Sequence, residues 1–182
     1  MESILIVVIV VVIIAIIFFW CISTRNRFAR LTVKINESDS GVDVALTKRF
    51  DTLTKMLDVT KGYAKHEAEI LTNIVNLRSG MSMTERCTAN HQMNELSEKL
   101  SILVENYPEL KSSENYKQLQ ISISEVEEHL QAARRIYNMN VSSFNQLLTS
   151  WPASIIGSSM HQTPKDFFEA DEIKKQDVKM NF

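Results

Sequence analysis

The chain has 182 residues, with 20 Lys and Arg against 22 Asp and Glu and a formal net charge of −2 at pH 7. This balance gives no electrostatic case for a nucleic-acid partner, because such binding needs a basic surface that neutralises phosphates. Four glycines and three prolines argue against a β-rich or low-complexity protein, and two cysteines form no disulfide framework, which suits a reducing compartment.

An apolar run near the N-terminus is the strongest single signal. Residues 4–22 read ILIVVIVVVIIAIIFFWCI, without a charged residue, proline or glycine. As a helix this run spans about 28 Å, close to the roughly 30 Å hydrocarbon core of a bilayer. We therefore predict a transmembrane helix over 4–22, preceded by a short external tail at 1–3.

The run does not resemble a cleaved signal peptide. Such a peptide has a basic segment, a shorter apolar core and small residues at its cleavage site. Here residues 1–3 are Met-Glu-Ser, and the bulky Phe-Phe-Trp of residues 18–20 stands where small residues would be needed. The prediction is an uncleaved signal anchor.

Basic residues follow the run closely, and they predict its orientation. Arg25, Arg27, Arg30 and Lys34 lie just after it, and basic residues favour the cytoplasmic side of a membrane. We predict a single-pass protein of the inner (cytoplasmic) membrane with a cytoplasmic C-terminal domain. Trp20 suits the membrane interface, and the basic residues are expected to meet anionic lipid headgroups.

The rest of the chain shows helical periodicity. A juxtamembrane segment over 23–41 is expected to be helical, and its turn-forming residues 37–41 indicate either a break or a weak point in one long helix. Further on, apolar residues recur three and four apart, as on one helix face, and Lys61-Gly62 ends or kinks that helix. The members of this face are Val42, Leu46, Phe50, Leu53 and Leu57.

Three more helices are predicted within a bundle domain over 42–150. The second has its face from Tyr63 to Leu77. The third starts at a capping box of Ser82 and Glu85, and Pro108 stops it. The last and longest is capped by Ser112 or Ser113 and runs to about Ser150. Residues 151–182 are predicted to be a C-terminal linker and tail.

The third and last helices each have an apolar stripe. In the third the stripe alternates three and four residues apart, as expected of bundle packing, and it places Leu100 in the core. It consists of Met93, Leu96, Leu100, Leu103 and Tyr107. The stripe of the last helix consists of Tyr116, Leu119, Ile123, Val126, Leu130, Ala133, Tyr137, Phe144 and Leu148.

The sequence contains no convincing catalytic constellation. His66-Glu67-Ala68-Glu69-Ile70 lacks the second histidine of a zinc-protease motif, since two histidines one helical turn apart are what place two ligands on one metal. We expect no catalytic residue, metal or cofactor, and interpret His66 as a polar side chain near a helix start.

A polar line on the last helix borders its buried face, about 70° from the centre of the apolar stripe. It consists of Gln120, Glu127, Arg134, Asn138 and Asn145. One interpretation is a rim that fixes helix register. The other is a specific patch that meets Lys48, Arg49 and Asp51, or a partner protein. We expect Arg134 to join two helices, with Glu127 and Asp51 as candidate acceptors.

Ordered short motifs across nearly the whole chain resemble the LemA family. They are Leu46 with Lys48-Arg49-Phe50-Asp51, Lys61-Gly62-Tyr63-Ala64 with His66-Glu67, Glu105-Asn106-Tyr107-Pro108-Glu109-Leu110-Lys111, Leu119-Gln120, Glu127 with Arg134, Tyr137-Asn138, Phe144-Asn145, Pro152, Phe167-Phe168 and Phe182. The chain departs from the family pattern where Thr54 replaces a usual proline and where Phe28-Ala29 replaces a Tyr-Asn pair. The usual Trp before the first bundle helix is also absent.

This resemblance implies an all-α protein: an N-terminal transmembrane helix followed by an antiparallel four-helix bundle. It does not imply an enzyme. We expect a membrane-anchored, non-enzymatic interaction or scaffold protein that binds a protein partner in the membrane or envelope, linked to envelope stress or a membrane complex. The alternative is a regulatory or hydrolytic enzyme subunit with an unrecognised site. A pocket gathering several carboxylates or histidines with shifted pKa values would favour that alternative.

The first prediction is that the anchor stays on the mature protein. Without a basic segment or a small-residue cleavage site, signal peptidase has nothing to recognise. The intact mass of the membrane-extracted protein should therefore include residues 4–22. A mature chain that begins after this run would contradict the prediction.

Overall fold

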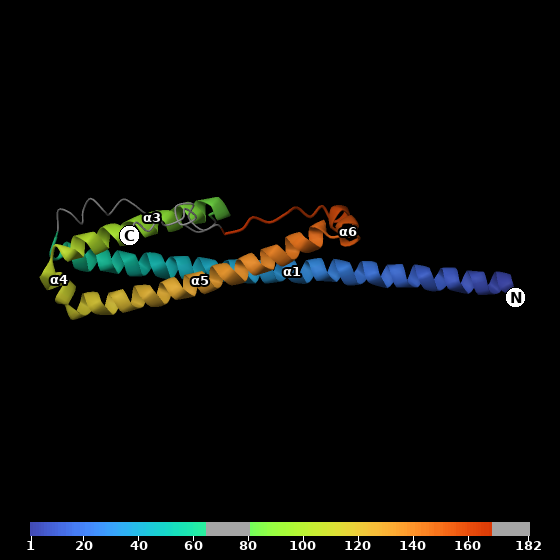
Figure 1. The fold of residues 1–182 in the computed structure, drawn as a ribbon, viewed down its shortest axis with the longest axis horizontal. Helices are drawn as coiled ribbons and strands as arrows, with labels where there is room; N and C mark the ends of the chain where they lie inside the picture. The colour runs from blue at the N-terminus through green and yellow to red at the C-terminus, as the bar shows by residue number, and fades with distance from the viewer. Residues whose placement is uncertain (65–80, 169–182) are drawn as a thin grey trace, which may run out of the picture. The chain divides into compact units, whose positions relative to one another are not determined.

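The computed structural model describes residues 1–64 and 81–168, and every regular element within those ranges is an α-helix (Figure 1). The all-α expectation is confirmed for this part of the chain. The helices are α1 (Glu2–Lys61), α3 (Met83–Glu105), α4 (Pro108–Ser112), α5 (Glu114–Thr149) and α6 (Ala153–Ser159). The predicted helix face from Tyr63 to Leu77 lies largely outside the described residues.

Helix α1 is 60 residues long and runs without interruption from the apolar segment through residues 37–41. Of the two interpretations of that stretch, the continuous helix is confirmed. Ser38 remains helical because its hydroxyl donates back to the carbonyl oxygens of Lys34 (2.8 Å) and Ile35 (3.0 Å), which satisfies a side chain that would otherwise favour a turn. The predicted end at Lys61 is also confirmed.

The capping box at the start of α3 is confirmed. The Glu85 backbone N–H donates to Ser82 Oγ at 3.3 Å, and the Ser82 N–H donates to Glu85 Oε2 at 2.7 Å. Two N–H groups that the first helical turn cannot satisfy are thereby bonded. Leu100 is fully buried, as its place in the apolar stripe predicted, and Pro108 opens the short helix α4.

Helix α5 begins after Ser113, whose hydroxyl accepts the Tyr116 N–H at 3.3 Å. Of the two predicted caps, Ser113 is correct. The prediction that this helix is the last and longest was wrong, since α1 is longer and α6 follows. Helix α6 forms in a stretch expected to be a linker, because Ala153 and Gly157, four residues apart, give it a buried face.

The chain forms two compact units. The first comprises residues 1–38 and 138–166, and in it α1, α5 and α6 meet around Phe28. This ring packs edge to face on Phe144, with centroids 5.7 Å apart. A Cβ atom added to Gly157 would lie 3.1 Å from the Phe28 ring and 2.6 Å from Leu148 Cδ1. Glycine therefore permits the close approach of α6.

The second unit comprises residues 39–64, 81–137 and 167–168. In it Arg86 of α3 contacts Asp39 of α1, and further along both helices Asn94 contacts Arg49. The two helices therefore run in the same direction. Helix α5 runs opposite to both, because Glu127 lies at the level of Arg49 and the later Tyr137 lies near Arg86.

The second prediction compares two glycines. Gly157→Ala should lower the free energy of unfolding by about 1–2 kcal/mol, since the new methyl group overpacks against Phe28 and Leu148. Gly41→Ala should raise it by about 0.5–1 kcal/mol, because alanine favours the helix and the added Cβ meets nothing within 4 Å. Denaturant melts of the full chain in micelles measure both. Equal effects would contradict the close approach at Gly157.

Candidate functional site

The first third of α1 presents apolar side chains on every side. From Ile4 to Phe19 its large apolar residues are 48–70% exposed. A helix that is apolar all round is normally buried in protein or in lipid. Within the described ranges, α1 is the one helix long and apolar enough to cross a membrane, so the structure is consistent with a single-pass anchor.

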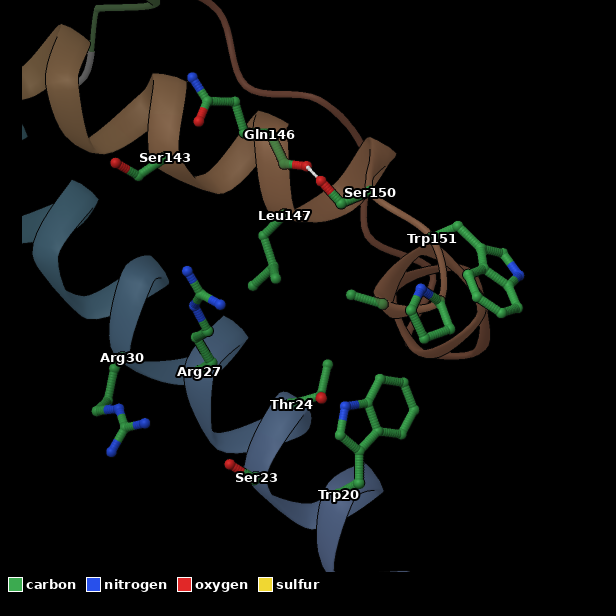
Figure 2. A pocket seen from close by; sticks show the side chains of 12 residues that line it. Trp20, Ser23, Thr24, Arg27, Arg30, Ser143, Gln146, Leu147, Ser150 and Trp151 are labelled. Carbon is green, nitrogen blue, oxygen red and sulfur yellow. Dashed lines mark hydrogen bonds between the residues drawn. The ribbon is translucent and has the colours of Figure 1, made fainter. Parts of the chain in front are cut away.

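A hollow of about 470 Å³ opens just beyond this apolar run, within the first unit. Figure 2 shows Trp20 of α1 across from Trp151, with the Arg27 guanidinium between α1 and α5 and Arg30 further along α1, directed away from α5 in this view. The lining residues are Trp20, Ser23, Thr24, Arg27, Arg30, Ser143, Gln146, Leu147, Ser150, Trp151, Pro152 and Ala153.

Three of the four residues predicted to meet the membrane interface line this hollow. They are Trp20, Arg27 and Arg30, whereas Arg25 lines a second hollow of about 420 Å³ beside Ile156 and Met160. In the part of the chain that the structure describes, no carboxylate pairs with any of these arginines. The hollow is therefore a basic site with tryptophan and hydroxyl groups around it.

Arg49 forms a buried polar junction in the second unit, with 3% of its side chain exposed. Its Nη1 atom donates to Asn90 Oδ1 at 2.5 Å, and Nη2 donates to Asn94 Oδ1 at 2.6 Å and pairs with Glu127 Oε1 at 2.6 Å. The planar guanidinium thus bonds α1 to both α3 and α5. A buried cation tolerates this position because several acceptors surround it.

Arg86 forms a second junction between α3 and α1. It pairs with Asp39 at 2.5 Å and, through Nε, with Asp43 Oδ1 at 3.1 Å. Burial raises the pKa of the Asp43 carboxyl despite the opposing effect of Arg86, and neighbouring Asp39 adds to the rise. Hydrogen bonding to Asp39 raises the pKa of Arg86 against its own desolvation. The Asp43 carboxyl, whose pKa is raised, is therefore already paired with Arg86.

Within the predicted polar patch, the structure brings Arg49 and Glu127 together, whereas Lys48 and Asp51 are exposed. Arg134 lies over the Phe168 ring, 4.6 Å from its centroid. That Arg134 joins two helices with Glu127 and Asp51 as acceptors stays a prediction.

The remaining predicted residues are placed separately. Asn145 of α5 binds the segment after α6. Its side-chain Nδ2 donates to the Lys165 carbonyl and its Oδ1 accepts the Lys165 N–H, both at 2.9 Å. Asn138 is half-buried. His66 and Glu67 lie outside the described residues.

Sequence reasoning missed several functional residues. Asn90 and Asn94 are one turn apart on α3, at the border of its buried face. Two amides at this spacing can bind the same cationic side chain, here Arg49, and this pattern could have been recognised in the sequence. Trp151 was assigned to a linker, although an exposed tryptophan is typical of an interface.

The described residues show no arrangement typical of an enzyme. Among them, no group of three or more His, Cys, Asp or Glu side chains could hold a metal ion. Neither Cys21 nor Cys87 takes part in a disulfide among the described residues. The geometry described so far supports membrane contact and helix joining.

Comparison with known proteins points to one family. A family model described as LemA family matches residues 38–182. A curated relative, Protein LemA of Metamycoplasma hominis, is 29% identical over 166 residues, which cover 88% of this chain and 76% of the relative.

The third prediction tests the buried junction. Arg49→Met should lower the free energy of unfolding by about 2–4 kcal/mol, because it leaves Asn90 and Glu127 without their cation. Arg49→Lys should recover only part of this loss, since lysine lacks the planar fork. The neighbouring exposed Lys48→Met should change stability by less than about 0.5 kcal/mol.

Denaturant melts of the full chain in micelles give all three values. If Arg49→Met and Lys48→Met melt alike, the guanidinium does not join the helices.

Proposed function

We propose, because this chain belongs to the LemA family and begins with a helix able to span a bilayer, that it is a single-pass anchor protein of the inner (cytoplasmic) membrane. Its helical domain faces the cytoplasm and binds another protein of the membrane or envelope. In this proposal it acts as a scaffold in a membrane complex or in the response to envelope stress, without catalysing a reaction.

The observation that carries the proposal is the exposed apolar run of α1. Its large apolar side chains from Ile4 to Phe19 are 48–70% exposed, and transfer of such a surface from water to lipid is strongly favourable. The hollow lined by Arg27 and Arg30 lies on α1 just after this apolar run. Basic residues in this position support the cytoplasmic side for the C-terminal domain.

The non-enzymatic role is supported by how the ionisable groups are used. Arg49, Glu127, Arg86 and Asp39 join helices to one another. Asp43, whose carboxyl pKa is raised, is paired with Arg86 and lines none of the hollows described above. The rival function, a regulatory or hydrolytic enzyme subunit, would need a pocket that gathers several such groups.

We also propose that the domain after the anchor is an antiparallel four-helix bundle. The opposite directions of α1 and α5 support this arrangement. The predicted helix with its face from Tyr63 to Leu77 lies largely outside the described residues.

Partner binding is tested by affinity capture. The full chain, cross-linked in its own membrane and extracted in mild detergent, should enrich the same membrane protein in every replicate. The anchor helix alone, with the same tag, serves as the control. A partner captured equally well by the helix alone would show that the domain does not bind it.

The fourth prediction concerns orientation. Protease added to intact cells should leave residues 28–182 uncut, because Arg25, Arg27, Arg30 and Lys34 hold the domain inside. Lysis should expose the same residues to digestion. Cleavage within the domain before lysis would reverse the proposed orientation.

A further inference from the structure

We propose that the hollow between Trp20 and Trp151 binds the headgroup of an anionic phospholipid. The inference rests on the proposed membrane anchor and goes further, because it names a site, its residues and its ligand. The site lies within the first unit, between the end of the apolar run of α1, the end of α5 and the start of α6.

The position of the hollow along α1 places it at headgroup level. Arg27 is five residues beyond Ile22, about 7.5 Å along the helix axis, and a headgroup layer is roughly 5–7 Å thick. Arg30 lies about 12 Å beyond Ile22, but helical side chains lean towards the N-terminus. Both guanidinium groups can therefore reach back towards phosphates.

The chemistry of the lining fits a phosphodiester with polar substituents. Arg27 and Arg30 supply donors in the planar fork that matches phosphate. The Ser23 hydroxyl lines the same hollow and can donate to a further headgroup oxygen. The Ser143 and Ser150 hydroxyls donate to the Met139 and Gln146 carbonyls, so they can accept from hydroxyl groups of a headgroup. A volume of about 470 Å³ is within the roughly 300–1,000 Å³ typical of sites for drug-sized ligands, which favours a headgroup over a free phosphate ion.

Exposed apolar groups on the α6 side indicate contact with the bilayer surface. Trp151 is 83% exposed and Ile155 is 61% exposed, while Ile156 lies beside Cys21 and Ile22 of the apolar run. An indole ring at the border of the hydrocarbon is in its preferred environment. The membrane face of this unit therefore includes α6 as well as α1.

The arginines of the hollow differ from their neighbour in a way that supplies a control. Arg25 has the same charge on the same helix, but it lines the second hollow, with Ile156 and Met160. A general attraction of basic residues to anionic lipid would depend on Arg25 as much as on Arg27. A built site depends on Arg27 and Arg30 alone.

The two tryptophans of the chain, Trp20 and Trp151, both line the hollow, so intrinsic fluorescence reports on this site. The full chain is reconstituted in vesicles of phosphatidylcholine that contain increasing fractions of brominated phosphatidylglycerol or brominated phosphatidylcholine. Brominated phosphatidylglycerol should quench the fluorescence at a distinctly lower mole fraction.

The fifth prediction is the effect of the variants. Arg27→Gln and Arg30→Gln should each raise the phosphatidylglycerol fraction needed for half-quenching by about fivefold, whereas Arg25→Gln should leave it unchanged. Circular dichroism should show the same helix content for all variants. Millimolar inorganic phosphate should not reverse the quenching.

Three results would overturn the headgroup site. They are equal quenching by the two lipids, equal effects of Arg25→Gln and Arg27→Gln, and reversal by inorganic phosphate, which would mean a site for the free ion. None of these results would contradict the proposed membrane anchor. A chain that fails to insert into either vesicle would instead contradict the proposed function.

Discussion

The exposed apolar surface of α1 is the constraint on which the rest of this account depends. Its large apolar side chains between Ile4 and Phe19 are at least 48% exposed, and only lipid removes such a surface from water without a second protein layer. Because α1 continues unbroken past Ile22, its rise per residue fixes the depth of the residues that follow. In the proposed membrane arrangement, Trp20 lies at the end of the apolar run, and the Arg27 and Arg30 side chains can reach back towards the headgroups.

Beyond the apolar run, charged residues divide into two kinds. Arg49 and Arg86 are surrounded by acceptors from other helices and serve as joints. Arg27 and Arg30 line a hollow and have no carboxylate partner among the described residues. Burial of a guanidinium without acceptors is costly, so Arg49 and Arg86 are buried where acceptors surround them, and they stabilise the fold. Arg27 and Arg30 remain available to an anionic ligand. This division is consistent with the proposed membrane-anchored role.

The sequence predicted the features that depend on local chemistry. The apolar run, the Ser82–Glu85 box and the buried position of Leu100 follow from composition, capping and period. It left open whether α1 is continuous, and it did not predict the helix α6, because turn-forming residues are overridden by packing that only the folded chain reveals. The partners of Arg49 and Arg134 depend on how helices are aligned, which a single sequence does not specify. The family resemblance was confirmed, but it did not identify these contacts.

The most direct test of the central claim is the depth of the two native cysteines. Spin labels on Cys21 and Cys87, in single-cysteine variants of the full chain in vesicles, report their relative accessibility to oxygen and to a water-soluble nickel complex. We expect the label at Cys21, near the end of the apolar run, to be more accessible to oxygen, which concentrates in lipid, and the label at Cys87 to be more accessible to the nickel complex. A label at Cys21 that is as accessible to nickel as that at Cys87 would contradict a membrane-spanning α1.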